Sequence, residues 1–384
     1  MSRRPNSTEP PTNNTMTDTK LRWGILSTAQ IARKNWSAIR HSGNSTVVAV
    51  ASRDVEKSRR FIADCQADAP MAAVPQAFGS YEELLASKDV DAVYIPLPTA
   101  LRKEWVLRAA AAGKHVVCEK PCGGTVADLR EMLAACRQHQ VQFIDGVMFM
   151  HSARLPKMRA VLNDGTSIGA IKRITSSFSF AAPPDFFAGN IRARSELEPL
   201  GCLGDLGWYN IRFALWAMNW QLPRRATGRF LTESTAPGSH AAVPSEFSGE
   251  LFFDDGVTSS FYCSFITANE QTATISGTKG YLRVADFVVP FFGSQAAFEV
   301  NNTVLNIRDC DFNMEEHASR VVVSEYGNSH PTAQESNMFR NVAAQVRTGR
   351  LNESWLEMAL QTQQVMEACL QSARADGRMV DVLT

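Results

Sequence analysis

The first 150 residues alternate between short apolar runs and longer segments with helical spacing, and this alternation limits the possible folds more than any other feature. The runs and segments are strands expected at 21–27, 46–52, 91–98, 116–119 and 141–149, and helices expected at 30–41, 54–65, from Ser80 onward, 99–112 and 125–139. Ser80 with Glu83 three residues later forms a capping-box pattern. Repeated β-α units of this kind predict a doubly wound parallel sheet, the Rossmann arrangement.

The pattern changes after residue 150, where strand-like runs follow one another. The runs at 248–255 and 257–265 are joined through Asp255-Gly256, which predicts a hairpin. One helix is expected at 204–220, and two more at 334–347 and 353–376. The fold class is therefore α/β followed by α+β, with a mixed or antiparallel open sheet. The expected segments are a disordered tail (1–20), a Rossmann domain (21–147), an α+β domain (148–333) and helices that pack back on the core (334–384).

Composition excludes several classes of partner. Lysine plus arginine equals aspartate plus glutamate, 39 each, so no nucleic-acid or anionic-membrane partner is expected. The longest apolar stretch, near 213–218, is too short to span a bilayer. No apolar segment follows Arg3-Arg4, so no signal peptide is expected, and Met16 is an alternative start. The eight scattered cysteines indicate free thiols in a reducing cytoplasm and no metal site.

A dinucleotide site is expected where the first strand meets the first helix, although the usual glycines are missing. Ser27, Ala29 and Ala32 stand at the three glycine positions. Small residues still allow close approach of a pyrophosphate to a helix N-terminus. A purely structural turn would show the same pattern. The residues expected to bind cofactor here are Ser27, Thr28, Ala29, Gln30 and Ile31.

The ends of the later strands bear on cofactor choice. The second strand ends at Ser52-Arg53-Asp54. NAD sites place an acidic residue at such an end, whereas NADP sites favour a cation and a small polar group. Ser52 and Arg53 therefore favour NADP. Asp54, which could also be a helix N-cap, keeps NAD possible. The cofactor residues expected at other strand ends are Leu97, Pro98, Thr99, Glu119 and Lys120.

Two short motifs suggest proton transfer. The strand at 116–119 ends in Glu119-Lys120-Pro121, and Asp205 and Tyr209 stand four residues apart at the start of the helix expected at 204–220. An ammonium near a phenol favours the phenolate, so Lys120 would lower the pKa of Tyr209. The spacing of Asp205 and Tyr209 is common, and an aspartate on the helix dipole beside a packed tyrosine is the alternative.

Together, the motifs resemble the glucose-fructose oxidoreductase / inositol dehydrogenase / MocA family. The resemblance rests on Glu119-Lys120-Pro121, on Gly201-x-x-Gly204-Asp205-Leu-Gly-x-Tyr209 and on 276–280 (SGTKG), and it extends over 21–382. Plant-type and dihydrodiol-dehydrogenase-like members look most similar. The resemblance implies proton transfer by Lys120 and Tyr209 with help from Asp205. It also implies a homo-oligomer, dimer or tetramer, through the open sheet.

Two departures from the family pattern accompany this resemblance. Many members have histidine where Tyr209 stands, and relatives often have histidine in place of Arg102. The expected activity is NAD(P)-dependent interconversion of a secondary alcohol and a carbonyl on a small molecule: a sugar, polyol or cyclic diol. Met148, His151 and Arg192 are expected to contact that substrate. The alternatives are a non-catalytic dinucleotide-sensing protein and a scaffold that binds no nucleotide.

Overall fold

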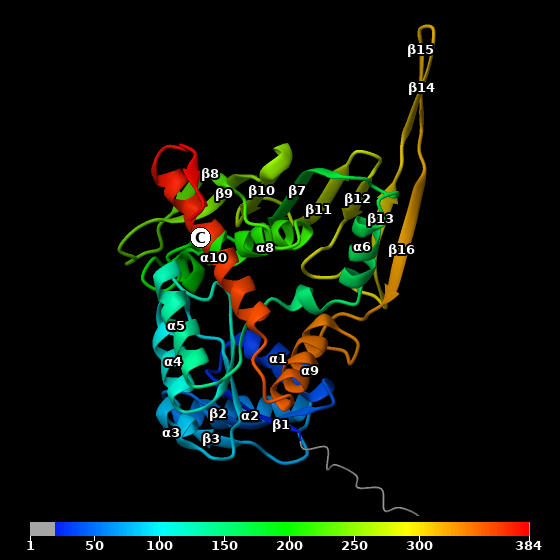
Figure 1. The fold of residues 1–384 in the computed structure, drawn as a ribbon. Helices are drawn as coiled ribbons and strands as arrows, with labels where there is room; N and C mark the ends of the chain where they lie inside the picture. Colours follow the sequence, from blue (N-terminus) through cyan, green and yellow to red (C-terminus); the bar gives the residue numbers. More distant parts are fainter. Residues whose placement is uncertain (1–19, 384) are drawn as a thin grey trace, which may run out of the picture.

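The computed structural model describes residues 20–383 and has two stacked parts (Figure 1). The tail expected over 1–20, except its last residue, and the alternative start at Met16 lie outside the described residues. The lower part holds a six-stranded parallel sheet in the order β3-β2-β1-β4-β5-β6, which is the doubly wound order. Its strands are β1 (Leu21–Leu26), β2 (Ser45–Ala51), β3 (Gln76–Phe78), β4 (Ala92–Ile95), β5 (His115–Cys118) and β6 (Phe143–Asp145).

Helices cover both faces of this sheet, as the alternating pattern predicts. They are α1 (Gln30–His41), α2 (Val55–Asp68), α3 (Tyr81–Ala86), α4 (Thr99–Ala111) and α5 (Val126–Gln138). Side chains of Asp54, Ser80 and Thr125 accept hydrogen bonds from amides of the first turn, which explains where α2, α3 and α5 begin. The strand expected at 141–149 is shorter, because a 3₁₀ turn over Met148–His151 follows β6.

The upper part holds a nine-stranded mixed sheet in the order β16-β13-β12-β11-β7-β10-β9-β8-β17. Only the pair β7 and β10 is parallel, and the predicted hairpin joins β9 to β10 through Asp255, whose φ is 55°. The strands are β7 (Ile171–Ser179), β8 (Arg225–Ser234), β9 (Val243–Phe252), β10 (Thr258–Ser264), β11 (Glu270–Gly277), β12 (Tyr281–Val284), β13 (Gln295–Asn301), β16 (Ala318–Ser324) and β17 (Val380–Asp381).

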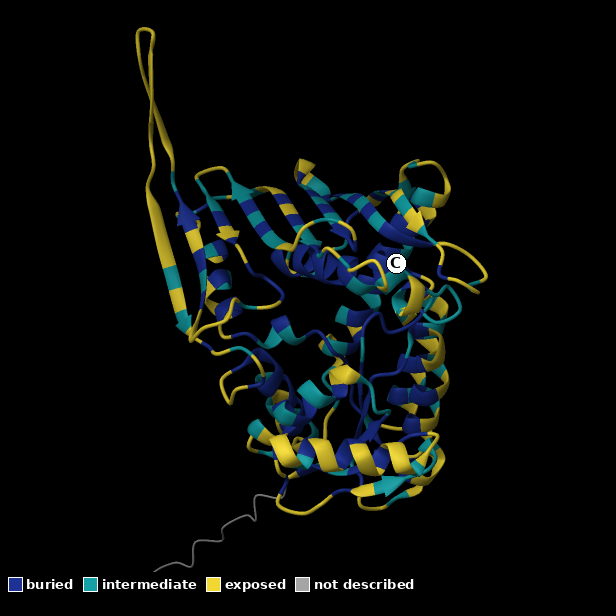
Figure 2. Ribbon diagram, turned by 180° about the vertical axis from the view of Figure 1, so that it is seen from behind, coloured by how far each residue is buried: buried dark blue, intermediate teal, exposed yellow. Residues whose placement is uncertain are grey.

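The helices of the upper part cover one face of its sheet. Both α6 (Arg154–Asn163) and α8 (Trp208–Ala217) lie on the side that faces the Rossmann part, and the opposite face is open (Figure 1). Every residue of α8 is buried, and within the sheet it packs against β7 and β10. Strands β14 (Val304–Arg308) and β15 (Asp311–Glu315) form a separate hairpin that stands away from the body, exposed along its length (Figure 2).

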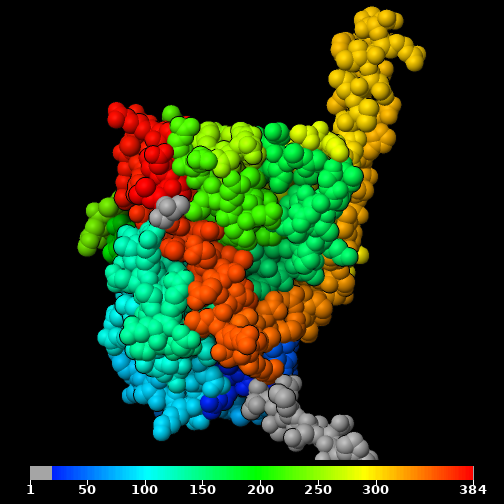
Figure 3. Space-filling view, viewed as in Figure 1, coloured from blue at the N-terminus to red at the C-terminus, as the bar shows by residue number. Residues whose placement is uncertain are grey.

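Two C-terminal helices connect the parts. α9 (Gln334–Arg347) packs Phe339 against Trp23 of β1 and Tyr94 of β4, so it completes one face of the Rossmann sheet. α10 (Glu353–Arg374) packs against α5, α8 and β8. In the space-filling view these helices, orange to red, run along one side of both parts (Figure 3). Between residues 20 and 383, no helix has the length and apolar character needed to cross a bilayer.

Candidate active site

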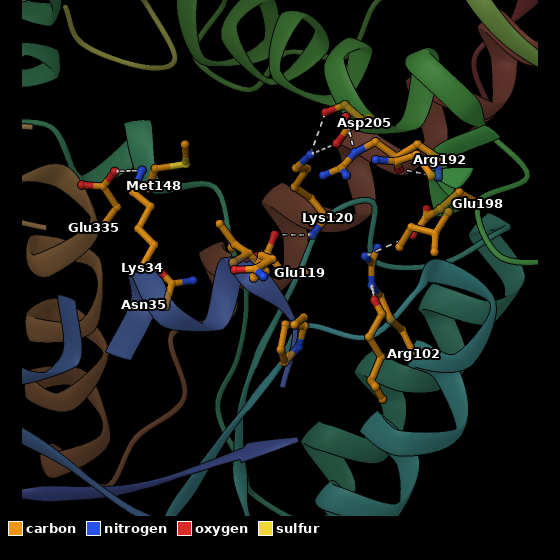
Figure 4. Close-up of a pocket in the computed structure, with 18 of the residues that line it drawn as sticks. Lys34, Asn35, Arg102, Glu119, Lys120, Met148, Arg192, Glu198, Asp205 and Glu335 are labelled. Carbon is orange, nitrogen blue, oxygen red and sulfur yellow. Dashed lines mark hydrogen bonds and ion pairs between the residues drawn. The ribbon is translucent and has the colours of Figure 1, made fainter. Parts of the chain in front are cut away.

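Glu119 and Lys120 directly follow the end of β5 and lie between the two parts. Glu119 accepts a hydrogen bond of 2.6 Å from the hydroxyl of Tyr94, which in turn accepts one of 2.6 Å from the amide of Asn35. Lys120 is nearly buried, with 9% of its side chain exposed. Its Nζ donates to Asp205 at 2.6 Å to Oδ1 and 2.7 Å to the backbone carbonyl oxygen (Figure 4). The two motifs therefore meet directly.

Close backbone packing explains why these two motifs lie in contact. Asp205 lies in a π-helical turn over Leu203–Gly207 that precedes α8, and such turns are frequent at functional sites. A Cβ on Gly204 would lie 3.0 Å from Cγ of Pro121 and 2.7 Å from Cβ of Leu200. Glycine is therefore required at this close approach. It allows the turn that carries Asp205 to rest on the Glu119-Lys120-Pro121 segment.

Asp205 binds two cations. Besides Lys120, Nε of Arg192 donates to its Oδ2 at 2.7 Å, from the loop that follows α7 (Phe186–Gly189). Burial alone would raise the pKa of the Asp205 carboxyl, but the charges of Arg192 and Lys120 hold it far below its usual value. Asp205 therefore stays ionised at neutral pH and holds both cations at the cavity wall.

Tyr209 lies beside this ion cluster, and 6% of its surface is exposed. Nζ of Lys120 lies 4.8 Å from the centre of the Tyr209 ring, and the Tyr209 hydroxyl lies 3.7 Å from Sδ of Met148. Burial and the charges of Glu119 and Asp205 raise the pKa of Tyr209 well above its ordinary value of 10. The expected lowering of this pKa by Lys120 is therefore wrong: the Lys120 ammonium is paired with Asp205, and two carboxylates lie near the phenol.

A cavity of about 500 Å³ opens onto these residues. It is lined from the first turn of α1, the strand ends, the loop after α7 and α9 (Figure 4). The predicted site residues that line it are Ala29, Gln30, Ile31, Leu97, Glu119, Lys120, Met148, Arg192, Asp205 and Tyr209. This group joins residues expected to bind cofactor, to bind substrate and to transfer protons.

Other predicted residues lie elsewhere or are already engaged. The amide and hydroxyl of Thr99 both donate to the carboxylate of Glu198, and Pro98 precedes the first residue of α4. His151 does not line the cavity. It ends the 3₁₀ turn that Met148 begins, and its ring contacts Trp355 edge-on at 6.1 Å while its Nδ1 is 3.0 Å from Nδ2 of Asn341.

The turn between β1 and α1 has a backbone conformation that glycine usually provides, although Ser27 stands there. Ser27 has a φ of 132°, a conformation that glycine adopts more readily. Its Oγ accepts a hydrogen bond of 3.1 Å from the amide of Ala29, next to Thr28. α1 has no acidic residue in its first turn, and Ala32 is fully buried. The helix N-terminus therefore suits the pyrophosphate of a dinucleotide.

At the end of β2, the carboxylate of Asp54 accepts a hydrogen bond of 2.9 Å from the amide of Glu56. Asp54 is the N-cap of α2, so the alternative given for it in the sequence analysis is confirmed. Ser52 is buried, and Arg53 is exposed.

Sequence reasoning did not find several residues of the cavity wall: Lys34, Asn35, Arg102, Glu198, Glu335 and Met338. Lys34 follows Gln30 by four residues, so helical spacing could have found it. Glu335 comes from α9, far along the chain. It pairs with Lys34 and is 4% exposed, and its Oε2 accepts no hydrogen bond from the described residues. Across 20–383, no three histidine, cysteine or acidic residues gather as a metal site would require.

Comparison with known proteins agrees with this geometry. Residues 21–147 match the model of the oxidoreductase family with an NAD-binding Rossmann fold, and 156–283 match the GFO/IDH/MocA C-terminal domain. The chain is 32% identical over 272 residues to the mouse (Mus musculus) trans-1,2-dihydrobenzene-1,2-diol dehydrogenase, covering 70% of this chain and 76% of the relative. The chain belongs to the GFO/IDH/MocA oxidoreductase family. It is therefore an NAD(P)-dependent dehydrogenase or reductase, and the predicted family is confirmed.

A sugar dehydrogenase and a ketoreductase are also similar to this chain. D-xylose 1-dehydrogenase (NADP(+)) 2 of Haloferax volcanii is 32% identical over 260 residues, covering 68% of this chain and 74% of the relative. A 3-ketoreductase from Actinomadura kijaniata, solved with TDP-benzene and NADP, superposes with a TM-score of 0.75 at 24% identity, over 92% of this chain and 98% of that one. This structural likeness confirms the predicted two-part fold.

Proposed function

We propose that this protein interconverts a secondary alcohol and a carbonyl on a sugar, polyol or cyclic diol, with Tyr209 transferring the proton and Lys120 beside it. One observation carries the proposal: Lys120, Asp205 and Tyr209 line the same cavity as the first turn of α1. A bound nicotinamide cofactor would supply or accept the hydride. The residues of this chain bind and orient the substrate, and they transfer the proton.

The raised pKa of Tyr209 suits the reducing direction best. Its phenol is protonated at neutral pH and can donate to a substrate carbonyl oxygen while the carbonyl carbon receives the hydride. The ammonium of Lys120, 4.8 Å from the ring centre, would stabilise the phenolate left behind. Asp205 keeps that ammonium in place. In the oxidising direction Tyr209 must first lose its proton, so oxidation should accelerate as the pH rises.

The substrate class is inferred from the polar groups that line the cavity. Asn190, Arg192, Glu198 and Asp205 line it together with Tyr209. Such a set of donors and acceptors suits a ligand with several hydroxyl groups. The names of the relatives, a diol dehydrogenase and a xylose dehydrogenase, are consistent with this class.

NADP is the favoured cofactor, with NAD possible. The acidic group near the end of β2, Asp54, is engaged as a helix cap, and Arg53 is exposed beside the buried Ser52. A guanidinium suits a 2′-phosphate. The relatives point the same way, since one is named an NADP(+) enzyme and another was solved with NADP. Fluorescence titration should show that Arg53→Ala weakens NADPH binding at least tenfold and NADH binding less than threefold. Equal losses for both nucleotides would argue against this preference.

The catalytic proposal is tested by Lys120→Met in an assay of NADP⁺ reduction with aldoses, inositols and cyclic trans-diols. We expect turnover to fall about 100-fold or more, while NADPH binding stays within about tenfold. Lys103→Met is the matched control, because Lys103 pairs with Asp128 and Glu131 on the surface of α4. Near-normal turnover by Lys120→Met would refute the role of Lys120. Binding of neither nucleotide to the unmodified protein would refute the enzyme proposal as a whole.

A further inference from the structure

Glu335, in the first turn of α9, has a buried carboxylate that is only partly hydrogen-bonded. The residue is 4% exposed. One of its oxygens pairs with Nζ of Lys34, whereas Oε2 accepts no hydrogen bond from the described residues. A carboxylate has about four lone-pair sites, so most of its capacity to accept hydrogen bonds is unused. Burial without partners is costly, and a donor from a bound molecule would remove that cost.

Glu335 lies in the wall of the active-site cavity. It lines that cavity together with Lys34. The torsion that turns a glutamate carboxyl group is broad and roughly two-fold, so either oxygen can face the cavity. Both residues lie on one side of Lys120, whereas Arg192 lies on the other (Figure 4). The unused acceptor is therefore on the side away from Arg192.

The other cavity residues on this side are apolar. Met338 follows Glu335 by three residues on α9, and Ile31 precedes Lys34 by three on α1, so each pair shares a helix face. α9 also packs against the 3₁₀ turn that begins at Met148, another residue of the cavity wall. Thioether and aliphatic side chains around one carboxylate suit a flat ring that carries a hydrogen-bond donor.

The proposed reaction limits where a nicotinamide ring can lie. Its C4 exchanges a hydride with the carbon whose oxygen bonds to the hydroxyl of Tyr209, so the ring must lie close to that hydroxyl. Sδ of Met148 is 3.7 Å from the same hydroxyl, and Met148 and Glu335 lie on the same side of the cavity (Figure 4). The carboxamide of the ring is attached to C3, next to C4, and its NH₂ group is a donor.

Charge selects this group among the parts of the cofactor and substrate. A carboxylate accepts hydrogen bonds and donates none, and it repels phosphate groups. The donors that remain are the carboxamide and the hydroxyl groups of a substrate. Arg192, which is expected to contact the substrate, lies on the opposite side of Lys120 (Figure 4). The carboxamide is therefore the favoured partner of Glu335.

We propose that Glu335 binds the nicotinamide ring by accepting a hydrogen bond from its carboxamide NH₂ group. Lys34 holds the carboxylate in place from α1. The inference rests on the proposed function, because it takes the hydride carrier to be a nicotinamide bound in this cavity. Glu335 is then a cofactor-binding residue that orients C4 toward the substrate.

The test compares NADPH with two analogues that differ only at the amide. The thioamide analogue keeps the NH₂ donor, whereas the 3-acetylpyridine analogue has a methyl group in its place. Isothermal titration calorimetry on the full chain measures the three dissociation constants without turnover. We expect the acetylpyridine analogue to bind the unmodified protein at least about tenfold more weakly than the other two. NADH and its analogues form a parallel series.

Two variants assign this preference to Glu335. Glu335→Ala should weaken the binding of NADPH at least about tenfold and that of the acetylpyridine analogue less than about threefold. In Glu335→Gln, Lys34 would bond to the one remaining oxygen and leave a donor toward the ligand. The preference for amide over acetyl should then fall at least about tenfold. Each variant is compared with the unmodified protein, so intrinsic differences between the nucleotides cancel.

Glu353→Gln is the matched control. Glu353 stands in the first turn of α10, as Glu335 does in α9, but it pairs with Arg137 at the surface. This variant should keep the full preference for the amide. Thermal denaturation checks that each variant is folded.

Equal losses for NADPH and the acetylpyridine analogue in both Glu335 variants would overturn the proposal, because a structural role weakens all nucleotides alike. Unchanged nucleotide binding with a raised KM would also overturn it, and would assign the unused acceptor to a substrate hydroxyl. Neither result bears on the proposed function, which is tested separately by Lys120→Met and by nucleotide binding to the unmodified protein.

Discussion

Lowering the pH from about 7.5 to about 5 should destabilise this protein through His151. Nδ1 of His151 lies 3.0 Å from the Nδ2 donor of Asn341, so the neutral ring accepts a hydrogen bond there. A protonated ring would place two donors against each other. Burial, together with the charge of Arg212, lowers the pKa of His151 from 6.5 to about 4.

The magnitude follows from the two pKa values. Above pH 6.5 the ring is neutral in both the folded and the unfolded chain, so it adds no pH dependence. As the pH falls from 6.5 to about 4, the unfolded chain binds a proton that the folded chain excludes, and folding stability is lost. At about pH 5 the loss is about 2 kcal/mol, which for a chain of 384 residues would lower the melting temperature by roughly 2–3 °C.

Thermal denaturation of the unmodified protein and of His151→Asn at both pH values measures this loss. Asparagine can still accept from Asn341 but does not titrate, so the variant should lose about 2 kcal/mol less on acidification. His240→Gln, on an exposed loop, is the matched control and should behave like the unmodified protein. Equal pH dependence for His151→Asn and the unmodified protein would refute the reasoning.

Two further predictions concern the turn between β1 and α1 and the loop that carries Arg192. Ser27 is held at a φ of 132°, so Ser27→Gly should be more stable than Ser27→Ala by about 1–3 kcal/mol, since both lose the side-chain hydrogen bond and only glycine relieves the backbone. Equal melting temperatures for the two variants would contradict this. Arg192 is 42% exposed and bonds to Asp205, so Arg192→Ala should raise KM about tenfold and change kcat less than about threefold. Steady-state kinetics measure both constants, and a loss confined to kcat would show that Arg192 instead acts through Asp205.

Much of the Rossmann part could be predicted because its signals are local. Helices α1 and α9 begin and end at the predicted residues, and side-chain caps mark the start of α2, α3 and α5. β3 was missed because it has only three residues. The hairpin of β14 and β15 was missed because its strands are exposed and bury no apolar face against their own chain, so no apolar periodicity marks them. β8 was missed because the residues that it buries in its first half, Ala226 and Gly228, are small.

The site could be predicted in part for a similar reason. Lys120, Asp205 and Tyr209 belong to short motifs, and the structure brings them together. Glu335 enters the cavity from α9, and no local pattern relates it to Lys34. The pKa of Tyr209 was predicted in the wrong direction because the sequence does not show that Asp205 pairs with the Lys120 ammonium, or that Glu119 lies near the phenol.

The central claim is that Tyr209 transfers the proton in a site it shares with Lys120 and Asp205. The most direct test is the single-turnover rate of carbonyl reduction by Tyr209→Phe with NADPH already bound. Phenylalanine keeps the ring beneath the Lys120 ammonium and removes only the hydroxyl. We predict a rate at least about 100-fold lower, with NADPH affinity within about threefold of the unmodified protein. An unchanged rate would contradict the account.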